Sequence, residues 1–363
     1  MTHSLRRSSL EARLAADCLD AILVTDLVNI RYLSGFTGSN AALLVFADDT
    51  PPVLATDSRY ITQAARQAPD VDLVIDRSCG RRLVSVALDR RARRIGFESH
   101  VVTVAGFDTL AAVVADTPGV ELVRTAGEVE ALREVKDDSE VALLQRACAA
   151  ADAALTALID GGGLRPGRTE RAVARELEAL MLEHGADGPS FETIVAAGAN
   201  SAVPHHRPTD AVLERGDFVK IDFGALVGGY HSDMTRTFVL GAAAAWQREI
   251  YLLVAHAQRA GSEALRPGAQ LCEVDAAARG VIAAAGYAEQ FGHGLGHGVG
   301  LQIHEAPGIG SASAGTLRAG SVVTVEPGVY LPDRGGVRIE DTLVVGERAP
   351  ELLTRFPKDL AIL

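Results

Sequence analysis

The sequence predicts a mixed fold: an N-terminal α/β domain over residues 1–130, followed by an α+β domain over residues 131–363. A chain of 363 residues is too long for one ordinary core. The first third alternates short apolar runs with amphipathic stretches, a pattern typical of strands and helices in turn. In the second half, two similar hairpin patterns follow one another, which indicates an internal repeat.

The first domain contains four apolar runs that we expect to be buried strands and two amphipathic stretches that we expect to be helices. The strands are expected at residues 21–24, 41–46, 53–55 and 95–97, and the helices at 83–92 and 107–114. Gly35, Gly38, Ser39 and Asn40 indicate a tight loop after residues 29–33.

The second domain begins after a polar stretch at residues 132–139, where Asp138 or Ser139 is expected to cap a helix. That helix should end at the three glycines 161–163. A second helix should start near Thr169 and stop at Gly185. Two more are expected over residues 246–265 and 274–285, with strand-rich segments between and after them.

The two hairpin patterns each carry two acidic residues. Asp222 lies inside an apolar strand and Asp233 follows eleven residues later; Glu326 and Glu340 repeat this pattern with a separation of fourteen residues. The glycine pairs at 228–229 and 335–336 are expected to form the bends. Pairing of the two strands of each hairpin would then place its acids on one face.

Acids between apolar neighbours should be largely removed from water. Several such carboxylates close together repel one another unless cations neutralise them. Divalent ions with oxygen ligands are the usual solution. The alternative is that these are ordinary turn acids that face water, but the repetition of the pattern favours a metal site.

A glycine-rich segment supplies histidines. Every second residue from 292 to 300 is glycine, and His293, His297 and His304 lie within twelve residues. Imidazole is a ligand of Mn, Co, Fe or Zn and argues against a site for Ca or Mg alone. His205 and His206 form a weaker candidate, since an isolated pair also suits a solvated loop. No dinucleotide-binding G-x-G-x-x-G, H-E-x-x-H or G-x-S-x-G pattern is present.

Composition excludes several other classes of protein. The formal net charge is −12 and no basic stripe is present, which argues against a nucleic-acid binder. None of the four cysteines belongs to a C-x-x-C pair, and we expect them to be reduced. Residues 1–17 lack the apolar run of a signal peptide, and no run approaches the length of a membrane span. A cytoplasmic location without membrane contact is therefore expected.

Together these segments resemble the pita-bread metallopeptidase family, which includes methionine aminopeptidase, aminopeptidase P and prolidase. The family's five metal ligands correspond in order to Asp222, Asp233, His297, Glu326 and Glu340. The runs 325–330 and 335–341, and Pro204 followed by His205, resemble the proline-specific branch, and the match to mycobacterial-type cytoplasmic Xaa-Pro peptidases is very close. Residues 29–35 and 56–60 resemble the extra N-terminal domain of aminopeptidase P, prolidase and creatinase.

The resemblance implies a creatinase-like N-terminal domain and a pita-bread catalytic domain with a pseudo-two-fold repeat. It implies hydrolysis of the Xaa-Pro bond at peptide N-termini or in Xaa-Pro dipeptides, two divalent ions with Mn first and Co, Zn or Fe as alternatives, and a homodimer. Two alternatives stay open: a broader or methionine-type aminopeptidase, and a metal-free pita-bread protein that binds peptides. Creatinase lacks the metal ligands that are present here.

The resemblance also implies residue roles. Asp222 and Glu340 would bridge the ions, with Asp233 on one ion and His297 and Glu326 on the other. Glu326 is expected to be the proton shuttle for an attacking water molecule. His304 is expected to hydrogen-bond the reacting carbonyl oxygen, and His293 is expected to line the proline pocket. His205 is expected to contact the substrate or the leaving group.

The remaining candidates have alternative or supporting roles. Arg338 is expected either to pair with a ligand carboxylate, to receive a substrate carboxylate, or to form a plain buried ion pair. Thr235 and His231 share the strand face of Asp233 and are expected to support the ligands. Tyr60 either reaches an active site across a dimer interface or packs at a helix start, and His206 has no assigned role.

Overall fold

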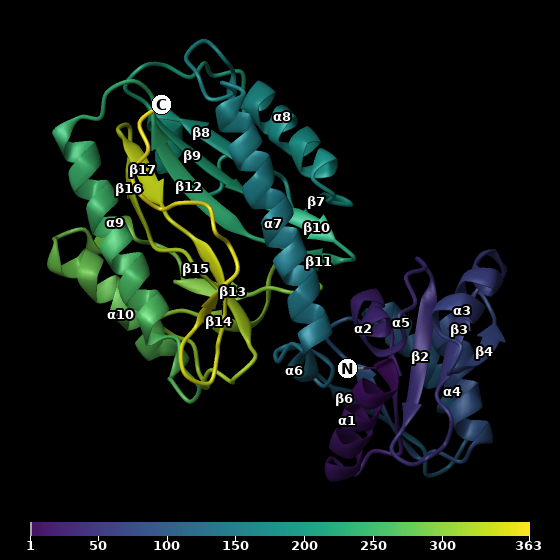
Figure 1. The fold of residues 1–363 in the computed structure, drawn as a ribbon. Helices are drawn as coiled ribbons and strands as arrows, with labels where there is room; N and C mark the ends of the chain where they lie inside the picture. Colours follow the sequence, from purple (N-terminus) through teal and green to yellow (C-terminus); the bar gives the residue numbers. More distant parts are fainter. Residues whose placement is uncertain (1) are drawn as a thin grey trace. The chain divides into compact units, whose positions relative to one another are not determined.

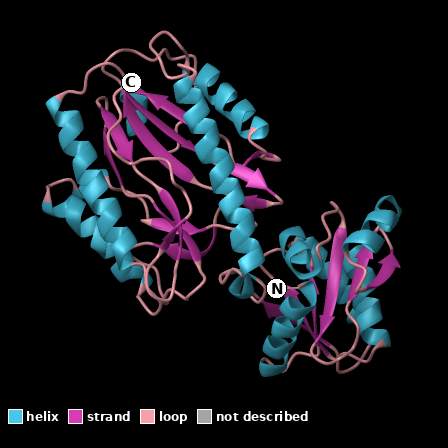
Figure 2. Cartoon of the chain, in the orientation of Figure 1, coloured by secondary structure: helices cyan, strands magenta, loops and turns pink. Residues whose placement is uncertain are grey.

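The computed structural model describes residues 2–363, and the chain divides into two units between Arg133 and Glu134. Figure 1 shows the first unit in purple and blue and the second in teal, green and yellow. Strands form the interior of each unit and helices lie outside them (Figure 2).

The first unit is built on one six-stranded sheet with the order β4-β3-β2-β1-β5-β6. Its strands are β1 Ala21–Val24, β2 Ala41–Phe46, β3 Val53–Thr56, β4 Asp72–Ile75, β5 Arg94–Glu98 and β6 Glu121–Thr125. Its α-helices are α1 His3–Ala16, α2 Leu27–Ser34, α3 Ile61–Gln67, α4 Cys79–Asp89, α5 Val104–Val114 and α6 Glu130–Arg133. The four expected strands and two expected helices are present, so the α/β prediction for this unit is confirmed.

Helix α2 was not among the helices expected for this unit. Residues 27–34 form α2 because the Asp26 side chain accepts hydrogen bonds from the backbone of Val28 and Asn29. Gly35 ends the helix at φ 80°, a conformation that favours glycine.

The second unit places strands between two helix pairs, α7 with α8 and α9 with α10 (Figure 1). The helices are α7 Asp138–Asp160, α8 Glu170–Glu183, α9 Ala245–Ala264 and α10 Leu271–Ala284. The strands are β7 Gly188–Pro189, β8 Ile194–Ala197, β9 Phe218–Phe223, β10 Ala225–Val227, β11 Tyr230–His231, β12 Met234–Val239, β13 Gly296–Gly298, β14 Glu305–Ile309, β15 Val322–Val325, β16 Gly328–Leu331, β17 Gly335–Arg338, β18 Asp341–Val344 and β19 Glu351–Leu352. This is the expected α+β organisation.

Helix α7 corrects two expectations. Its cap is Asp137, because Asp137 and Glu140 form a reciprocal capping box, so the prediction of Asp138 or Ser139 was wrong. By length and composition alone, α7 is also apolar enough to cross a membrane, which the sequence analysis did not find. Its apolar side is instead part of the core: Leu155 and Leu158 have no exposed surface and pack with α8 and the strands. Core helices of this kind pass the same test.

The two acidic hairpins form as expected, but only one bends at its glycine pair. Gly228 and Gly229 have positive φ and lie between β10 and β11. In the second hairpin the bend lies between Leu331 and Gly335, so the prediction that glycines 335–336 form it was wrong. Gly336 is required for another reason: a Cβ there would lie 2.7 Å from the Ser201 carbonyl oxygen.

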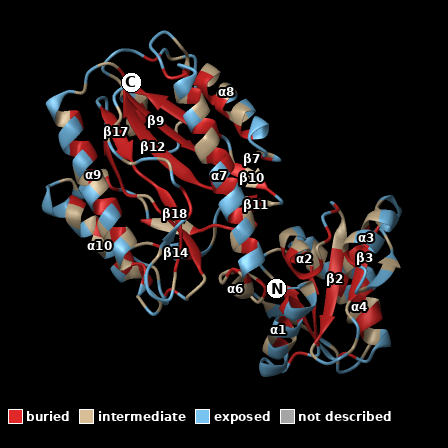
Figure 3. Cartoon of the chain, in the orientation of Figure 1, coloured by how far each residue is buried: buried red, intermediate tan, exposed pale blue. Residues whose placement is uncertain are grey.

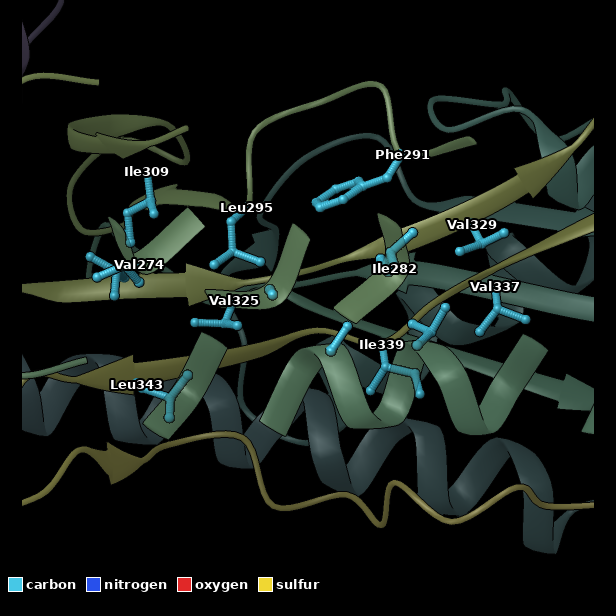
Figure 4. Close-up of a cluster of buried hydrophobic side chains, with 14 of the residues drawn as sticks. Val274, Ile282, Phe291, Leu295, Ile309, Val325, Val329, Val337, Ile339 and Leu343 are labelled. Carbon is cyan, nitrogen blue, oxygen red and sulfur yellow. The ribbon is translucent and has the colours of Figure 1, made fainter. Parts of the chain in front are cut away.

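A buried cluster of aliphatic side chains supports the second hairpin. Figure 4 shows Val325, Val329, Val337 and Ile339 in one cluster with Val274 and Ile282 of α10. Helix α9 packs against β15, β16 and β17. The strands of this unit are buried along most of their length (Figure 3). Side chains at the strand ends are therefore held in place by a packed core.

Candidate metal centre and active site

Four acids reach one place because they lie at the ends of the paired hairpin strands. Asp222 is near the end of β9 and Asp233 immediately precedes β12, which pairs with β9 so that Asp222 lies opposite Thr235. Glu326 immediately follows β15, and Glu340 immediately precedes β18. Strands β15 and β18 pair antiparallel. The two hairpins thus present their acids in equivalent ways.

The histidine comes from β13, which pairs with β15 next to Glu326. Glycines let this strand pass close to its neighbours: a Cβ on Gly296 would lie 2.0 Å from the Thr324 carbonyl oxygen, and one on Gly298 would lie 2.2 Å from that of Ala306. The alternating glycines therefore serve close strand packing that brings His297 to the acids.

The five side chains line a single cavity of about 300 Å³. One ligand atom each of Asp233, His297 and Glu340 lies within 4.8 Å of the others. His297 Nε2 is 3.5 Å from Asp233 Oδ2 and 3.3 Å from Glu326 Oε1. Asp222 lines the same cavity.

The acids are strongly removed from water, with exposed fractions of 7% for Asp222, 4% for Asp233 and 1% for Glu340. Burial, and then repulsion by neighbouring carboxylates, raises the pKa of Asp233 and of Glu340 well above its usual range. Burial alone would also raise the pKa of Glu326, but its hydrogen bond with His297 and the charges of His297 and Arg338 lower it to about 2. Ionising all four acids together would therefore cost a large electrostatic free energy unless positive charge is added to the site.

This donor set fits divalent cations. Within residues 2–363, Asp222 Oδ1 and Glu340 Oε1 are buried and have no hydrogen-bond partner, as expected of oxygens that bind ions. His297 Nδ1 lies 3.0 Å from the carbonyl oxygen of Gly298, which leaves Nε2 directed at the acids. Four carboxylates and one imidazole form a site for a transition ion with mixed oxygen and nitrogen ligands.

Three of the five side chains form the tightest group. Asp233, rather than Asp222, lies together with His297 and Glu340. Asp222 lines the same cavity, and its Oδ2 accepts a hydrogen bond from the guanidinium of Arg338.

Arg338 is buried beside the ligands with all of its side-chain nitrogens engaged. It donates to Asp222, to Tyr330 Oη at 2.7 Å and, through Nε, to Thr235 Oγ1 at 3.0 Å. Thr235 in turn donates to Glu340 Oε2 at 2.7 Å. Of the roles left open for Arg338, this geometry matches pairing with a ligand carboxylate.

The other expected histidines separate into two groups. His205 and His304 line the ligand cavity, and the His304 ring centre is 4.3 Å from that of His297. His293 lies instead in a neighbouring cavity of about 480 Å³, with its Nε2 2.9 Å from Tyr330 Oη. Burial lowers the pKa of both His293 and His304, so each imidazole is neutral at neutral pH.

Three further residues of the sequence analysis lie elsewhere. His231 Nδ1 is 2.9 Å from Ser190 Oγ and 3.1 Å from the Ser190 carbonyl oxygen. His206 pairs with the buried Glu170 at 2.8 Å. Tyr60, in the first unit, lies 2.6 Å from Ser39 Oγ.

Two residues near the site were missed from sequence. Tyr330 joins Arg338 to His293 through its hydroxyl, and burial raises its pKa to about 12. Thr324 Oγ1 accepts from the backbone of His297 and lies 3.2 Å from Glu326 Oε1. Thr324 precedes Glu326 by two residues, so the strand period was a usable signal for it.

Comparison with known families gives matches to both parts of the chain. Residues 142–347 match the model of metallopeptidase family M24, and residues 6–135 match that of the creatinase/prolidase N-terminal domain. The chain is 41% identical over 349 residues to an uncharacterized peptidase of Bacillus subtilis, which covers 95% of this chain and 96% of the relative.

Solved structures resemble the whole chain. An Xaa-Pro dipeptidase from Bacillus anthracis has a TM-score of 0.94 and 38% identity, with all of both chains covered. An X-Pro aminopeptidase from Thermotoga maritima has a TM-score of 0.87 and 33% identity, with 95% of this chain and 98% of that chain covered. The two-part fold expected from the sequence is therefore confirmed.

Proposed function

Because this chain belongs to metallopeptidase family M24, we propose that it hydrolyses the Xaa-Pro bond of short peptides with the help of two divalent metal ions. The observation that carries this proposal is the single buried cavity lined by four acids and His297. The names of the similar solved structures, an Xaa-Pro dipeptidase and an X-Pro aminopeptidase, support the choice of bond.

We assign the ions to five ligands: Asp222, Asp233, His297, Glu326 and Glu340. Ligand atoms of Asp233, His297 and Glu340 lie within 4.8 Å of one another, and Asp222 and Glu326 line the same cavity. Manganese is the proposed metal, and Co, Zn and Fe suit the same oxygen and nitrogen donors. When bound, the ions would supply a Lewis acid for the scissile carbonyl and lower the pKa of the attacking water.

The protein's own groups hold the substrate and move the proton. Glu326 lies at the cavity surface and is the proposed proton shuttle from water to the leaving nitrogen. His304 faces the same cavity as a neutral imidazole, which suits donation of a hydrogen bond to the reacting carbonyl oxygen. His205 lines the same cavity and is proposed to contact the substrate. Arg338 is proposed to orient Asp222 rather than to touch substrate.

The cavity suits a small substrate. Its volume of about 300 Å³ lies at the lower end of the range for small-molecule sites. We further propose a homodimer in the cytoplasm. The four cysteines are free, which fits a reducing compartment.

The test is turnover of Ala-Pro, Ala-Pro-Ala and Met-Ala by the purified protein with Mn²⁺ added. Cleavage of the proline-containing peptides and little cleavage of Met-Ala is the expected result. Preference for Met-Ala would replace the proposal with a methionine-type aminopeptidase. A protein that binds peptides but no metal and cleaves none of them would be a pita-bread binding protein instead.

A further inference from the structure

A dipeptide differs from a longer peptide by the free carboxylate on its second residue. In a cavity lined by four acids, that carboxylate needs a cation on the protein in addition to the catalytic ions. This question rests on the proposed function, since it concerns which Xaa-Pro substrates the same cavity accepts.

The buried cations next to the cavity have no donors to spare. Arg338 donates to Asp222, Thr235 and Tyr330 and also to the carbonyl oxygen of Pro204. Lys220 is fully buried and donates to the carbonyl oxygens of Val203 and Pro204 at 2.7 and 3.2 Å. Neither side chain can turn to a substrate without leaving a buried polar group unpaired.

One cation does face the cavity. Among the residues that the structure describes, Arg207 is the single arginine or lysine in the cavity lining. Arg207 Nε forms an ion pair at 3.2 Å with Glu192, which also lines the cavity. The two side chains are 83% and 64% exposed, and an ion pair this exposed is weak. The terminal nitrogens of Arg207 are therefore available to a carboxylate.

The backbone that carries Arg207 is fixed on both sides. We name residues 203–209 the strap. Lys220 and Arg338 hold its first end through the carbonyl oxygens of Val203 and Pro204. The buried carboxylate of Glu170 holds its second part, through His206 at 2.8 Å and the Thr209 backbone at 2.9 Å. Arg207 lies between these anchors, so the strap keeps a mobile side chain at a fixed point of the cavity rim.

We propose that Arg207 binds the free carboxylate of Xaa-Pro dipeptides and gives the protein a preference for dipeptides over substrates whose second residue is blocked or extended. Glu192 holds the guanidinium toward the cavity in the free protein and yields to the substrate. A guanidinium fork binds a carboxylate with two parallel hydrogen bonds, which an amide cannot replace.

The experiment compares kcat/KM for Ala-Pro with that for Ala-Pro-amide, with Mn²⁺ present. The Arg207→Gln variant should lose about tenfold in kcat/KM for Ala-Pro, chiefly through KM, and change little toward the amide. Arg207→Lys, which keeps the charge, should retain part of the preference. Arg171→Ala is the matched control, because it removes an arginine paired with Asp210 beside the strap but outside the cavity lining.

An equal loss on both substrates, or no loss, would overturn the role of Arg207. The wild-type protein separates this failure from that of the proposed function. Cleavage of both proline substrates by wild type, with no differential effect in Arg207→Gln, removes only the present inference. Cleavage of neither by wild type removes the proposed function and this inference together.

Discussion

Glu326 differs from its neighbours in both charge and position. Its pKa is lowered to about 2, chiefly by His297 acting against burial, whereas the pKa values of Asp233 and Glu340 are raised. Its side chain is 16% exposed, so it meets the open part of the cavity. An ionised carboxylate at the cavity surface can accept a proton from water.

Replacing Glu326 with glutamine should therefore preserve the fold and most metal binding but remove the proton acceptor. We expect turnover of Ala-Pro to fall by about 10²- to 10⁴-fold, the usual contribution of a general acid–base group. Steady-state kinetics on metal-saturated protein checks this, with Glu347→Gln at an exposed position as the control. Unchanged activity would remove Glu326 as the shuttle.

Arg338 acts on the site through Asp222. A lysine cannot reproduce its simultaneous bonds to Asp222, Thr235 and Tyr330. For Arg338→Lys we expect Mn²⁺ affinity to fall by about 10- to 100-fold, as for other residues that orient metal ligands.

Calorimetric titration with Mn²⁺ measures the effect. Arg334→Lys, at an exposed position in the same hairpin, is the control. Wild-type affinity combined with a raised KM for Ala-Pro would show instead that Arg338 binds the substrate.

At the scale of elements, the position of His297 depends on how closely β13 approaches β15. A methyl group on Gly296 would meet the Thr324 carbonyl oxygen, a backbone atom that cannot rotate away. Gly296→Ala should therefore lower the free energy of unfolding by about 1–3 kcal/mol and weaken metal binding. Gly292→Ala is the matched control, because nothing lies within 4 Å of its Cβ position. Equal thermal unfolding of the two variants would contradict this role.

Sequence predicted these elements well where one local pattern determines them. An acid inside an apolar strand, a glycine pair and a returning strand identify each hairpin without knowledge of its partners. The bend of the second hairpin was misplaced because glycine has two uses: Gly336 allows close approach to Ser201 and does not form the bend. The cap of α7 was misplaced because three adjacent residues can cap, and the partner Glu140 selects Asp137.

At the scale of the whole molecule, the buried acids link metal binding to pH. Asp233 and Glu340 hold protons more tightly in the metal-free folded protein than in an unfolded chain. The folded state therefore binds more protons above the unfolded pKa of about 4, and stability of the metal-free protein falls as pH rises. The lowered pKa of Glu326 has the opposite sign, but its contribution is lost only as pH falls from about 4 toward 2.

Metal ions must displace the protons of Asp233 and Glu340, so stabilisation by metal should grow with pH. We expect Mn²⁺ to raise Tm more at about pH 8 than at about pH 5.5. Differential scanning calorimetry with and without chelator measures both values. The double variant Asp233→Asn, Glu340→Gln should show almost no shift at either pH. A wild-type shift that does not depend on pH would contradict the linkage.

The site as a whole was only partly predictable from sequence. The four acids stand in a repeated local pattern, whereas the choice of His297 among three nearby histidines rested on the resemblance to the pita-bread metallopeptidases. The contacts that tune them join distant segments: Arg338 with Asp222, Tyr330 with His293, and Glu170 with the strap. Such contacts depend on which strands become neighbours, and a single sequence does not reveal that.

Four acids and one histidine form the proposed site for two divalent ions. Titration calorimetry of chelator-treated protein with Mn²⁺ tests it most directly. We expect binding of two ions per chain in wild type and loss of binding in Glu340→Gln, which removes a carboxylate whose ligand atom lies within 4.8 Å of those of Asp233 and His297. Wild-type protein that binds no Mn²⁺, Co²⁺ or Zn²⁺, or a Glu340→Gln variant that binds two ions as tightly as wild type, would contradict it.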